Sequence, residues 1–230
     1  KPVPPVFLLG DGTMNNIAHS IGIRNNGRTN LKRFLTMIHK RELVLRARTT
    51  MKIGDRYCFL FGCGMTCNVL SEIYKGKKGY LKSMEVVKNA IGEAITSSIF
   101  NRELKLLRPL AGELVCDGEQ LPFRHLLVVL AGTVEEVGMG FRPLYLASER
   151  KGYFHLIATD LDPKDMLVRI GFISTGKGAL IRNPRYCDRL VREMVIRSPE
   201  PFEYTMDGDM YVAERELKVS TGPDIQFVVV

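Results

Sequence analysis

The chain has 230 residues, of which 45% are hydrophobic and 25% charged, a balance typical of a soluble globular protein with one large or two small domains. No run of residues approaches the roughly 18 apolar positions that a membrane-spanning helix needs, and no secretory leader is recognisable near the start. The net charge of +8 favours an anionic partner such as a nucleotide, nucleic acid or acidic lipid, although the basic residues are scattered, as on an ordinary solvated surface.

The first predicted element is a buried strand over residues 6–9, which leads into a glycine-containing loop. The loop combines two glycines with neutral polar side chains: Gly10, Gly12, Thr13, Asn15 and Asn16. Glycines allow a tight turn and a close approach of the backbone to a ligand, and the apolar residues that follow predict a helix. A helix N-terminus after such a loop suits a phosphate group, because its first N–H groups are unpaired. An ordinary strand-to-helix turn is the commoner explanation of so few glycines.

Three further elements are predicted before residue 65. An amphipathic helix is capped by Thr29 or Asn30, with apolar residues recurring on one face at Leu31, Phe34, Leu35 and Ile38. Residues 43–48 alternate between apolar and basic side chains, which predicts a half-exposed strand. Residues 57–61 predict a buried strand that ends in the closely spaced glycines at 62 and 64.

One long helix is predicted over residues 81–99, where apolar residues recur at spacings of three or four. Beyond residue 100 the pattern is mainly β, with strands predicted around residues 114–115, 126–131, 153–159, 192–197, 216–220 and 225–230. A helix is predicted to start at Asp162-Pro163 and to run through Ile170, and a short helical turn to start at Asn183-Pro184. Many short strands separated by Gly and Pro turns favour a sandwich.

The cysteines and histidines do not follow a metal-binding pattern. Five cysteines are present, without a CxxC pair: Cys58, Cys63, Cys67, Cys116 and Cys187. An odd number of cysteines in apolar runs indicates buried, reduced thiols in a cytosolic protein. Cys63 and Cys67 have no nearby His, so a zinc site is not expected there. His155 alternates inside a predicted strand, which indicates a structural role.

A turn near the end of the chain carries two carboxylates, Asp207 and Asp209, around Gly208. Carboxylates held two residues apart on a tight turn can face one site, as a metal ligand or a general base requires. A plain Asp-Gly hairpin turn is the commoner explanation. The earlier Asp117-Gly118 shows that the dipeptide also occurs elsewhere in the chain.

The order of these pieces resembles the diacylglycerol kinase catalytic-domain superfamily, which includes bacterial lipid kinases and sphingosine kinases and is distantly related to NAD kinases. Residues 12–23 look like the family's second nucleotide loop, G-T-x-N-[DN]-x-A-R-x-L-G-I. Later stretches look like four more family motifs in the family's order, at residues 59–65, 116–131, 139–147 and 206–209. The resemblance covers nearly the whole chain and depends on this shared order, because no single motif is specific.

The resemblance implies a role for each matching residue. The implied nucleotide-binding residues are Gly10, Gly12, Thr13, Asn15 and Asn16. Asp209 stands where the family places its candidate base, and Asp207 would orient that site or water around Mg²⁺. The implied reaction transfers the γ-phosphate of ATP to the hydroxyl of a diacylglycerol-like lipid, and such transfer depends on positioning and on neutralising charge.

The chain departs from the family in three respects. The family's GGDGT loop is missing, and because the sequence begins with Lys and not with Met, we expect a fragment or a processed product. The family's base is usually Glu, whereas Asp209 is one methylene shorter. Many bacterial members hold a structural magnesium with a "DDG" sequence, but Lys151 replaces a ligand aspartate here, so we expect no metal at that site.

We therefore expect an α+β, mainly β fold. Residues 1–40 would be a remnant of an α/β nucleotide-binding domain, and residues 41–230 a two-layer, sandwich-like lipid-binding domain with one long helix. The expected function is that of an ATP- and Mg²⁺-dependent lipid kinase if the missing nucleotide-binding half is supplied. Alternatives are a non-catalytic lipid- or membrane-binding module and an NAD-kinase-like activity.

The expected location is the cytoplasm, with peripheral attachment to an anionic membrane surface. Nucleic acid is not an expected partner, because no aromatic-basic motif or helix-turn-helix pattern is present. The sequence leaves open whether the chain forms a homodimer.

Overall fold

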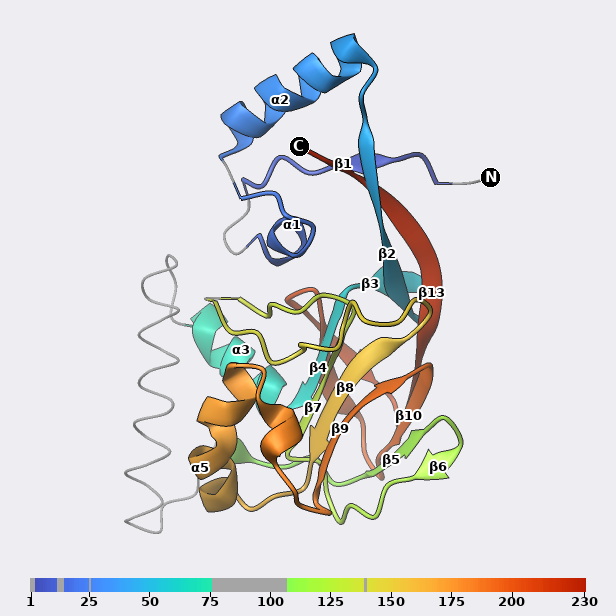
Figure 1. Ribbon diagram of the computed structural model, residues 1–230. Coiled ribbons are helices and arrows are strands. Elements are labelled where there is room, and N and C mark those ends of the chain that lie inside the picture. The colour runs from blue at the N-terminus through green and yellow to red at the C-terminus, as the bar shows by residue number, and fades with distance from the viewer. Residues whose placement is uncertain (1–2, 12–14, 25, 76–106, 139) are drawn as a thin grey trace.

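The computed structural model describes residues 3–11, 15–24, 26–75, 107–138 and 140–230 (Figure 1). The helices are α1 (Asn16–Ser20), α2 (Gly27–Lys40), α3 (Met65–Lys75), α5 (Pro163–Ser174) and the 3-10 helix η2 (Gly178–Leu180). The strands are β1 (Val6–Phe7), β2 (Val44–Ile53), β3 (Arg56–Cys58), β4 (Leu60–Gly64), β5 (Glu113–Cys116), β6 (Glu119–Gln120), β7 (Val128–Gly132), β8 (Phe154–Thr159), β9 (Tyr186–Val191), β10 (Glu193–Arg197), β11 (Phe202–Met206), β12 (Asp209–Ala213) and β13 (Glu216–Val229).

Two sheets pack face to face and form the body of the molecule. The first has the order β3-β2-β13-β10-β5-β6, with β1 also beside β13, and the second has the order β12-β11-β4-β7-β8-β9. Met51 and Ile196 from the first sheet share one buried cluster with Phe61 and Leu156 from the second. The core therefore lies between the sheets, and the predicted mainly β, two-layer sandwich is confirmed.

The strand predicted over residues 57–61 is two strands, because the chain changes sheets at Phe59. β3 pairs with β2 in the first sheet, whereas β4 pairs with β7 and β11 in the second. The backbone N–H of Phe59 donates to Asp207, and its carbonyl accepts from the N–H of Thr133 at 3.0 Å. These two bonds hold Phe59 at the step between the sheets.

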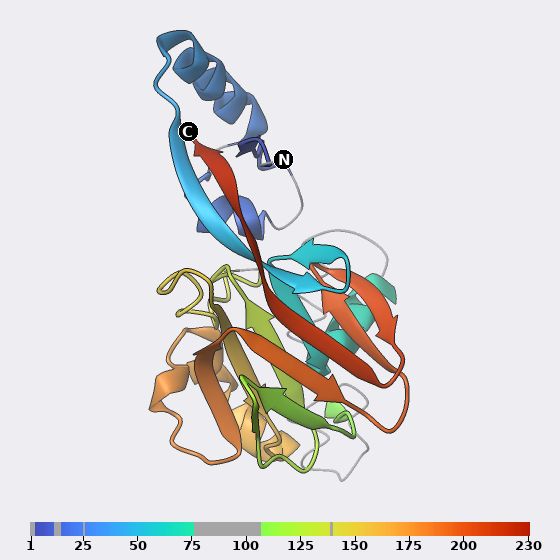
Figure 2. The same cartoon turned by 90° about the vertical axis from the view of Figure 1, so that its right-hand side faces the viewer.

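Beyond the body, β2 and β13 continue as a ribbon into a small lobe with β1, α1 and α2 (Figures 1 and 2). β1 lies parallel to the end of β13, with Val6 opposite Phe227. The strands predicted over 216–220 and 225–230 are one strand, β13, interrupted by a register shift between Thr221 and Asp224. The strand predicted over residues 6–9 is only two residues long.

Helix α2 begins three residues earlier than the periodicity predicts. Asn26 caps it through a hydrogen bond from the N–H of Thr29 to Asn26 Oδ1 at 2.9 Å, so the prediction of Thr29 or Asn30 as the cap is wrong. Phe34 stacks on Phe7 with ring centroids 4.2 Å apart. The rest of the predicted apolar face is exposed to solvent: Leu31, Leu35 and Ile38.

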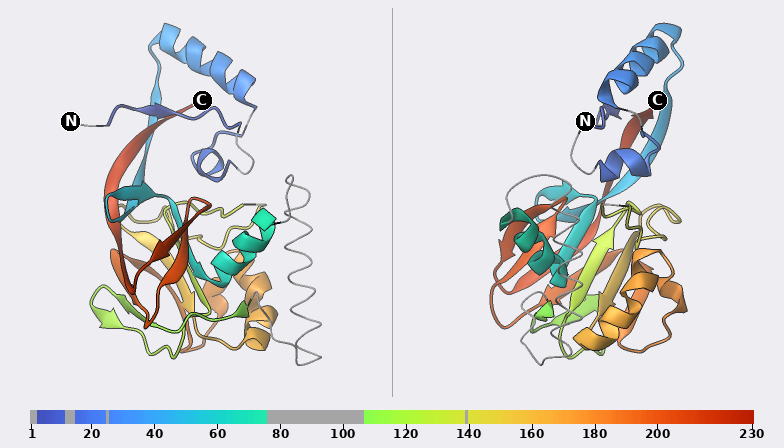
Figure 3. Two further views of the ribbon diagram at one scale, coloured as in Figure 1. Left: turned by 180° about the vertical axis from the view of Figure 1, so that it is seen from behind. Right: turned by 90° about the vertical axis from the view of Figure 1, so that its left-hand side faces the viewer.

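On the outer face of the second sheet lie α3 and α5 (Figure 3). α5 starts at Pro163 as predicted and runs to Ser174, beyond the predicted end. The helical turn expected at Asn183-Pro184 is a simple turn, closed by a bond from the N–H of Tyr186 to the carbonyl of Asn183 at 3.0 Å. The long helix predicted over 81–99 lies outside the described residues. Within the described part, no helix has the length and apolar character to cross a membrane.

Candidate functional site

The acidic turn joins β11 to β12 through Asp207 and Gly208, both with positive φ. Oδ1 of Asp207 accepts hydrogen bonds from the N–H groups of Phe59 at 2.9 Å and Leu60 at 2.8 Å. Withdrawal of this carboxylate from water raises the pKa of Asp207, the two backbone bonds oppose that rise, and the charge of Asp209 adds to it. Asp207 thus fastens the turn to the step between β3 and β4.

The second carboxylate of the turn is in a different environment. Asp209 is the first residue of β12 and is exposed, opposite Met206 across the hairpin. Within the described part of the chain, its carboxylate makes no hydrogen bond or ion pair with another side chain. Of the two predicted acidic residues, Asp209 is therefore the one with oxygen atoms available for a ligand.

The glycine loop is tied at both ends. Gly10 and Asn15 have positive φ, and Nδ2 of Asn15 donates to the carbonyl of Gly10 at 2.6 Å. Oδ1 of Asp11 accepts from the N–H of Gly27 at 2.9 Å, at the start of α2. Gly12 and Thr13 lie outside the described residues, so their predicted contacts stay predictions. The following helix α1 has only five residues, so its dipole contributes little to anion binding.

The lobe and the body meet at what we call the junction, a cluster of buried apolar residues from both: Ala18, Ile21, Ile23, Phe59, Val134 and Phe227. Phe59 supplies the link between the two predicted loops. Its ring packs in the same cluster as Ala18 of α1, while its backbone N–H is held by Asp207. The acidic turn therefore binds a residue of the same buried cluster to which the helix after the glycine loop belongs.

Charged side chains surround the junction. Nη2 of Arg48 donates to the carbonyl of Ser20 at 2.6 Å, and Nδ1 of His19 lies 3.6 Å from a carboxylate oxygen of Glu136. Burial lowers the pKa of Arg48, while the nearby Glu135 opposes that change. Sequence reasoning missed these residues as site candidates, although the apolar-basic alternation of residues 43–48 was the signal that placed Arg48 on a common face with Arg46.

Three buried polar atoms near the junction have no hydrogen-bond partner within the described part of the chain. They are Oδ1 of Asn16, Nε of Arg48 and Oγ1 of Thr133. Unsatisfied buried polar groups are rare in folded proteins and each calls for an explanation. The amide oxygen of Asn16 on α1 can accept a hydrogen bond, the Nε–H of Arg48 on β2 can donate one, and the hydroxyl of Thr133 after β7 can do either. Together these groups are suited to bind a polar ligand.

The loop expected to lack a metal contains an ion pair. Nζ of Lys151 lies 2.8 Å from Oδ2 of Asp224, whose Oδ1 accepts from Oγ1 of Thr49 at 2.8 Å. Burial alone would raise the pKa of Asp224, but the bonds from Lys151 and Thr49 lower it. The ammonium group thus supplies positive charge at the register shift of β13. Within the described residues, no three His, Cys, Asp or Glu side chains gather as a metal site would require.

The thiols and His155 are structural, as the sequence indicates. All five cysteines are free and buried, and burial raises the pKa of each. His155 is fully buried and its Nε2 lies 2.6 Å from Oδ1 of Asp188. Its Nδ1 accepts from the N–H of Leu146, so Nε2 carries the proton and donates to Asp188.

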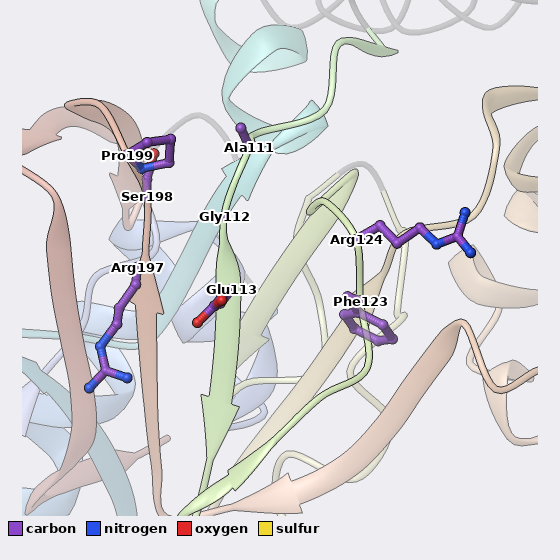
Figure 4. Close-up of a pocket in the computed structure, with 8 residues that line it drawn as sticks. All are labelled: Ala111, Gly112, Glu113, Phe123, Arg124, Arg197, Ser198 and Pro199. Carbon is purple, nitrogen blue, oxygen red and sulfur yellow. The ribbon is translucent and has the colours of Figure 1, made fainter.

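A hollow of about 390 Å³ lies between the end of β10 and the start of β5 (Figure 4). It is lined by Ala111, Gly112, Glu113, Phe123, Arg124, Arg197, Ser198 and Pro199. The side chain of Arg124 points away from the other lining residues, and Glu113 points towards Arg197 (Figure 4). None of the predicted site residues lines this hollow, so it is not part of the candidate site.

Comparison with known proteins supports the fold. No family model matches the chain, and no curated protein is significantly similar in sequence. Three solved structures from Bacillus anthracis str. Sterne are similar in fold. One, a candidate diacylglycerol kinase, has a TM-score of 0.67 and 12% identity, and the match covers 99% of this chain and 69% of that chain.

A second structure, a diacylglycerol kinase, has a TM-score of 0.63 and 11% identity, with coverage of 99% of this chain and 67% of that one. A third, another candidate diacylglycerol kinase, has a TM-score of 0.65 and 13% identity, with coverage of 99% and 70%. At these identities the likeness shows the fold alone. The chain has the fold of the diacylglycerol kinase-like structures, in agreement with the predicted resemblance.

Proposed function

We propose that this chain is the acceptor-binding part of a lipid kinase, which transfers the γ-phosphate of ATP to the hydroxyl of a diacylglycerol-like lipid. One observation carries the proposal: Phe59 lies in the same buried apolar cluster as Ala18 of α1, while its N–H is bound by Asp207. The loop that the resemblance assigns to ATP and the turn that it assigns to the base are thereby linked through one residue. The match to the fold of diacylglycerol kinase-like structures over 99% of the chain supports the same function.

In this proposal, Asp209 accepts the proton of the lipid hydroxyl as the oxygen attacks the γ-phosphorus, and ADP leaves as the bond from the γ-phosphorus to the bridging oxygen breaks. Asp207 acts by holding the turn, since both of its hydrogen bonds go to the backbone of β4 and the residue before it. Arg48, half-buried beside α1 with an unpartnered Nε, is suited to hold a phosphate oxygen.

The exposed carboxylate of Asp209 is compatible with Mg²⁺, which usually binds through one or two carboxylates together with substrate phosphates. When bound with ATP, the ion would neutralise charge on the phosphates. Gly10, Gly12, Thr13, Asn15 and Asn16 remain the proposed nucleotide-binding residues, with Asn15 already positioned by its bond to Gly10.

We also propose that residues 1–40 belong to an α/β nucleotide-binding domain that continues beyond this chain. Apart from its pairing with β13, β1 has no strand partner in the described residues, and the stripe of Leu31, Leu35 and Ile38 on α2 is exposed. A parallel sheet is normally covered by helices and continued by neighbouring strands. A strand with a free edge and a helix with an uncovered apolar face are therefore expected where part of such a sheet is missing.

The test is phosphate transfer by the full-length protein that contains residues 1–230. Radiolabelled ATP, Mg²⁺ and diacylglycerol in mixed micelles should give labelled lipid, and Asp209→Asn should abolish the label without changing thermal unfolding. A folded full-length protein that labels no lipid would remove the kinase proposal. Label formed equally well by Asp209→Asn would instead remove Asp209 as the base.

A second candidate, a lipid-binding module without catalysis, has its own support. The base position carries Asp, whose shorter side chain falls about 1.5 Å short of the usual Glu, and a misplacement of about 1 Å can lower a rate roughly a hundredfold. Lipid binding by the full-length protein without any phosphate transfer, including by Asp209→Glu, would favour this function.

A further inference from the structure

Helix α5 and the 3-10 helix η2 form a corner of the body with large apolar side chains in solvent. Val168 is 74% exposed, Phe172 is 47% exposed and Leu180 is 67% exposed. The other face of α5 is packed, since Met166 and Ile173 are buried against the second sheet. Single exposed apolar residues are common in proteins, but three on one corner form a patch that requires an explanation.

The backbone holds this corner in a defined shape. The N–H of Lys177 donates to the carbonyl of Phe172 at 2.8 Å, and the N–H of Leu180 to the carbonyl of Lys177 at 3.1 Å. Leu180 is therefore brought back beside the end of α5. The exposed Lys177 and Arg182 flank the apolar residues, and neither forms an ion pair within the described part of the chain.

We infer that the α5–η2 corner is the surface by which the protein docks on an anionic lipid bilayer. Val168, Phe172 and Leu180 would enter the boundary between headgroups and acyl chains, while Lys177 and Arg182 contact anionic headgroups. This combination of apolar tip and cationic flank is the chemistry of an interfacial membrane anchor. The inference deepens the proposed function, on which it rests, by naming the surface that would bring the enzyme to its lipid.

The corner is connected to the junction. The N–H of Arg142 donates to the carbonyl of Ser174 at the end of α5 at 2.9 Å, and Nη2 of Arg142 bonds to Glu135 at 3.2 Å. Glu135 follows Val134, which is part of the junction cluster. A bilayer that receives the corner would thus lie beside the loop that leads to the proposed site.

The other exposed apolar stripe, on α2, has a different explanation. It lies in the lobe, where β1 has a free edge and where the proposed nucleotide-binding domain continues beyond this chain. The corner instead belongs to the body, where the second sheet packs against the other face of α5.

Vesicle co-sedimentation tests the inference without any need for catalysis. The purified chain should bind vesicles that mix phosphatidylglycerol with phosphatidylcholine, and should bind pure phosphatidylcholine vesicles much more weakly. Phe172→Gln with Leu180→Gln should weaken binding to anionic vesicles by about tenfold or more, because two apolar side chains no longer enter the bilayer. Lys177→Gln with Arg182→Gln should weaken it by about fivefold for each charge removed.

Two matched controls replace an exposed apolar residue by Gln outside the α5–η2 corner. Val212→Gln, on β12, replaces a side chain that is 67% exposed, and Leu35→Gln, on α2, replaces one that is 56% exposed. Both should bind anionic vesicles as the unchanged chain does, and circular dichroism should show that all four variants are folded.

The inference would be overturned by unchanged binding of both α5–η2 variants, by an equal loss in either control, or by equal binding to neutral and anionic vesicles. A Phe172-dependent dimer that does not bind vesicles would overturn it in favour of a second copy as the partner. Phosphate transfer to a short-chain, water-soluble diacylglycerol by a full-length protein that fails to bind vesicles would leave the proposed function intact. Vesicle binding by a full-length protein that transfers no phosphate would remove the proposed function and leave the docking surface intact.

Discussion

Asp117 and Asp207 each fasten a hairpin turn to a neighbouring strand, and they do so with the same pattern of hydrogen bonds. Each has a φ of 50° and precedes a glycine with positive φ. Oδ1 of Asp117 accepts from the N–H groups of Arg192 and Glu193, both at 2.9 Å, as Oδ1 of Asp207 does from two consecutive residues. The Asp-Gly pair is therefore a clamp between strands, used once in each sheet.

We predict that Asp117→Ala and Asp207→Ala each lower the free energy of unfolding by about 1 to 2 kcal/mol, because each removes two charge-assisted bonds to backbone N–H groups at a partly exposed site. Urea unfolding followed by circular dichroism measures the change. Asp209→Ala is the control and should stay within about 0.5 kcal/mol, as for an exposed residue with no partner. Equal losses in all three variants would contradict the distinction between clamp and free carboxylate.

Asp209 also separates the catalytic from the structural role of the turn. In the full-length protein, Asp209→Asn should stop phosphate transfer, whereas Asp209→Glu should keep or raise kcat because the longer side chain extends the carboxylate by about 1.5 Å. The measurement is initial rate against lipid concentration at saturating ATP. Loss of activity in Asp209→Glu as large as in Asp209→Asn would show that the position does not act through its carboxylate.

β7, β8, β10 and the two halves of β13 were predictable because their apolar patterns and turn residues are local signals, whereas β9, β11 and β12 were not predicted. The step at Phe59 was not, because it depends on Asp207, which is distant in sequence but adjacent in space. The cap of α2 was missed because Asp11 accepts from the N–H of Gly27 and Asn26 accepts from the N–H of Thr29, and the apolar periodicity begins only after them. In the site, Asp207 and Asp209 have the same local sequence signal, and only strand pairing distinguishes them.

The junction charges illustrate the same limit. The alternation of residues 43–48 predicted a strand, but it did not say that Arg48 would be covered by α1. The position of α1 over Arg48 is decided by the packing of the lobe against the body. Neither the sequence of α1 nor that of β2 indicates that the two will meet.

A buried network around Asp188 should be among the most sensitive sites in the body. Its carboxylate accepts from Nε2 of His155, from the hydroxyl of Tyr145 and from the hydroxyl of Tyr186. We predict that Asp188→Ala lowers the free energy of unfolding by about 3 kcal/mol, because the buried His155 and Tyr186 and the half-buried Tyr145 lose their acceptor. Tyr145→Phe, which removes one donor and leaves the acceptor satisfied, should cost about 1 kcal/mol. Urea unfolding of the two variants gives the comparison, and similar losses would contradict a shared network.

The Lys151–Asp224 pair predicts a specific dependence on pH. Because the pKa of Asp224 is lowered in the folded state, the unfolded chain binds the proton more tightly as the solution becomes acidic. The stabilisation is therefore complete above the ordinary carboxyl pKa of about 4 and is lost as the pH falls through the lowered value. Lys151→Met should lower the melting temperature at neutral pH, and this difference from the unchanged chain should shrink in acid. A difference that grows in acid would contradict the assignment.

Phe59 provides the sharpest test of the link between the lobe and the body. Its side chain is 8% exposed, and its ring centroid lies 5.8 Å from that of Phe227 in the lobe. Phe59→Ala should lower the free energy of unfolding by about 3 to 5 kcal/mol, the usual cost of emptying a buried aromatic site. Native-state hydrogen exchange locates the effect: amides of α1 should lose more protection than those of β8, because Ala18 of α1 shares the buried cluster of Phe59 and β8 belongs to the core of the body. Phe59→Leu, which keeps much of the volume, should restore most of the protection in α1. If α1 and β8 lose protection equally, Phe59 supports the fold as a whole and does not couple the glycine loop to the acidic turn, and the proposed site loses its main support.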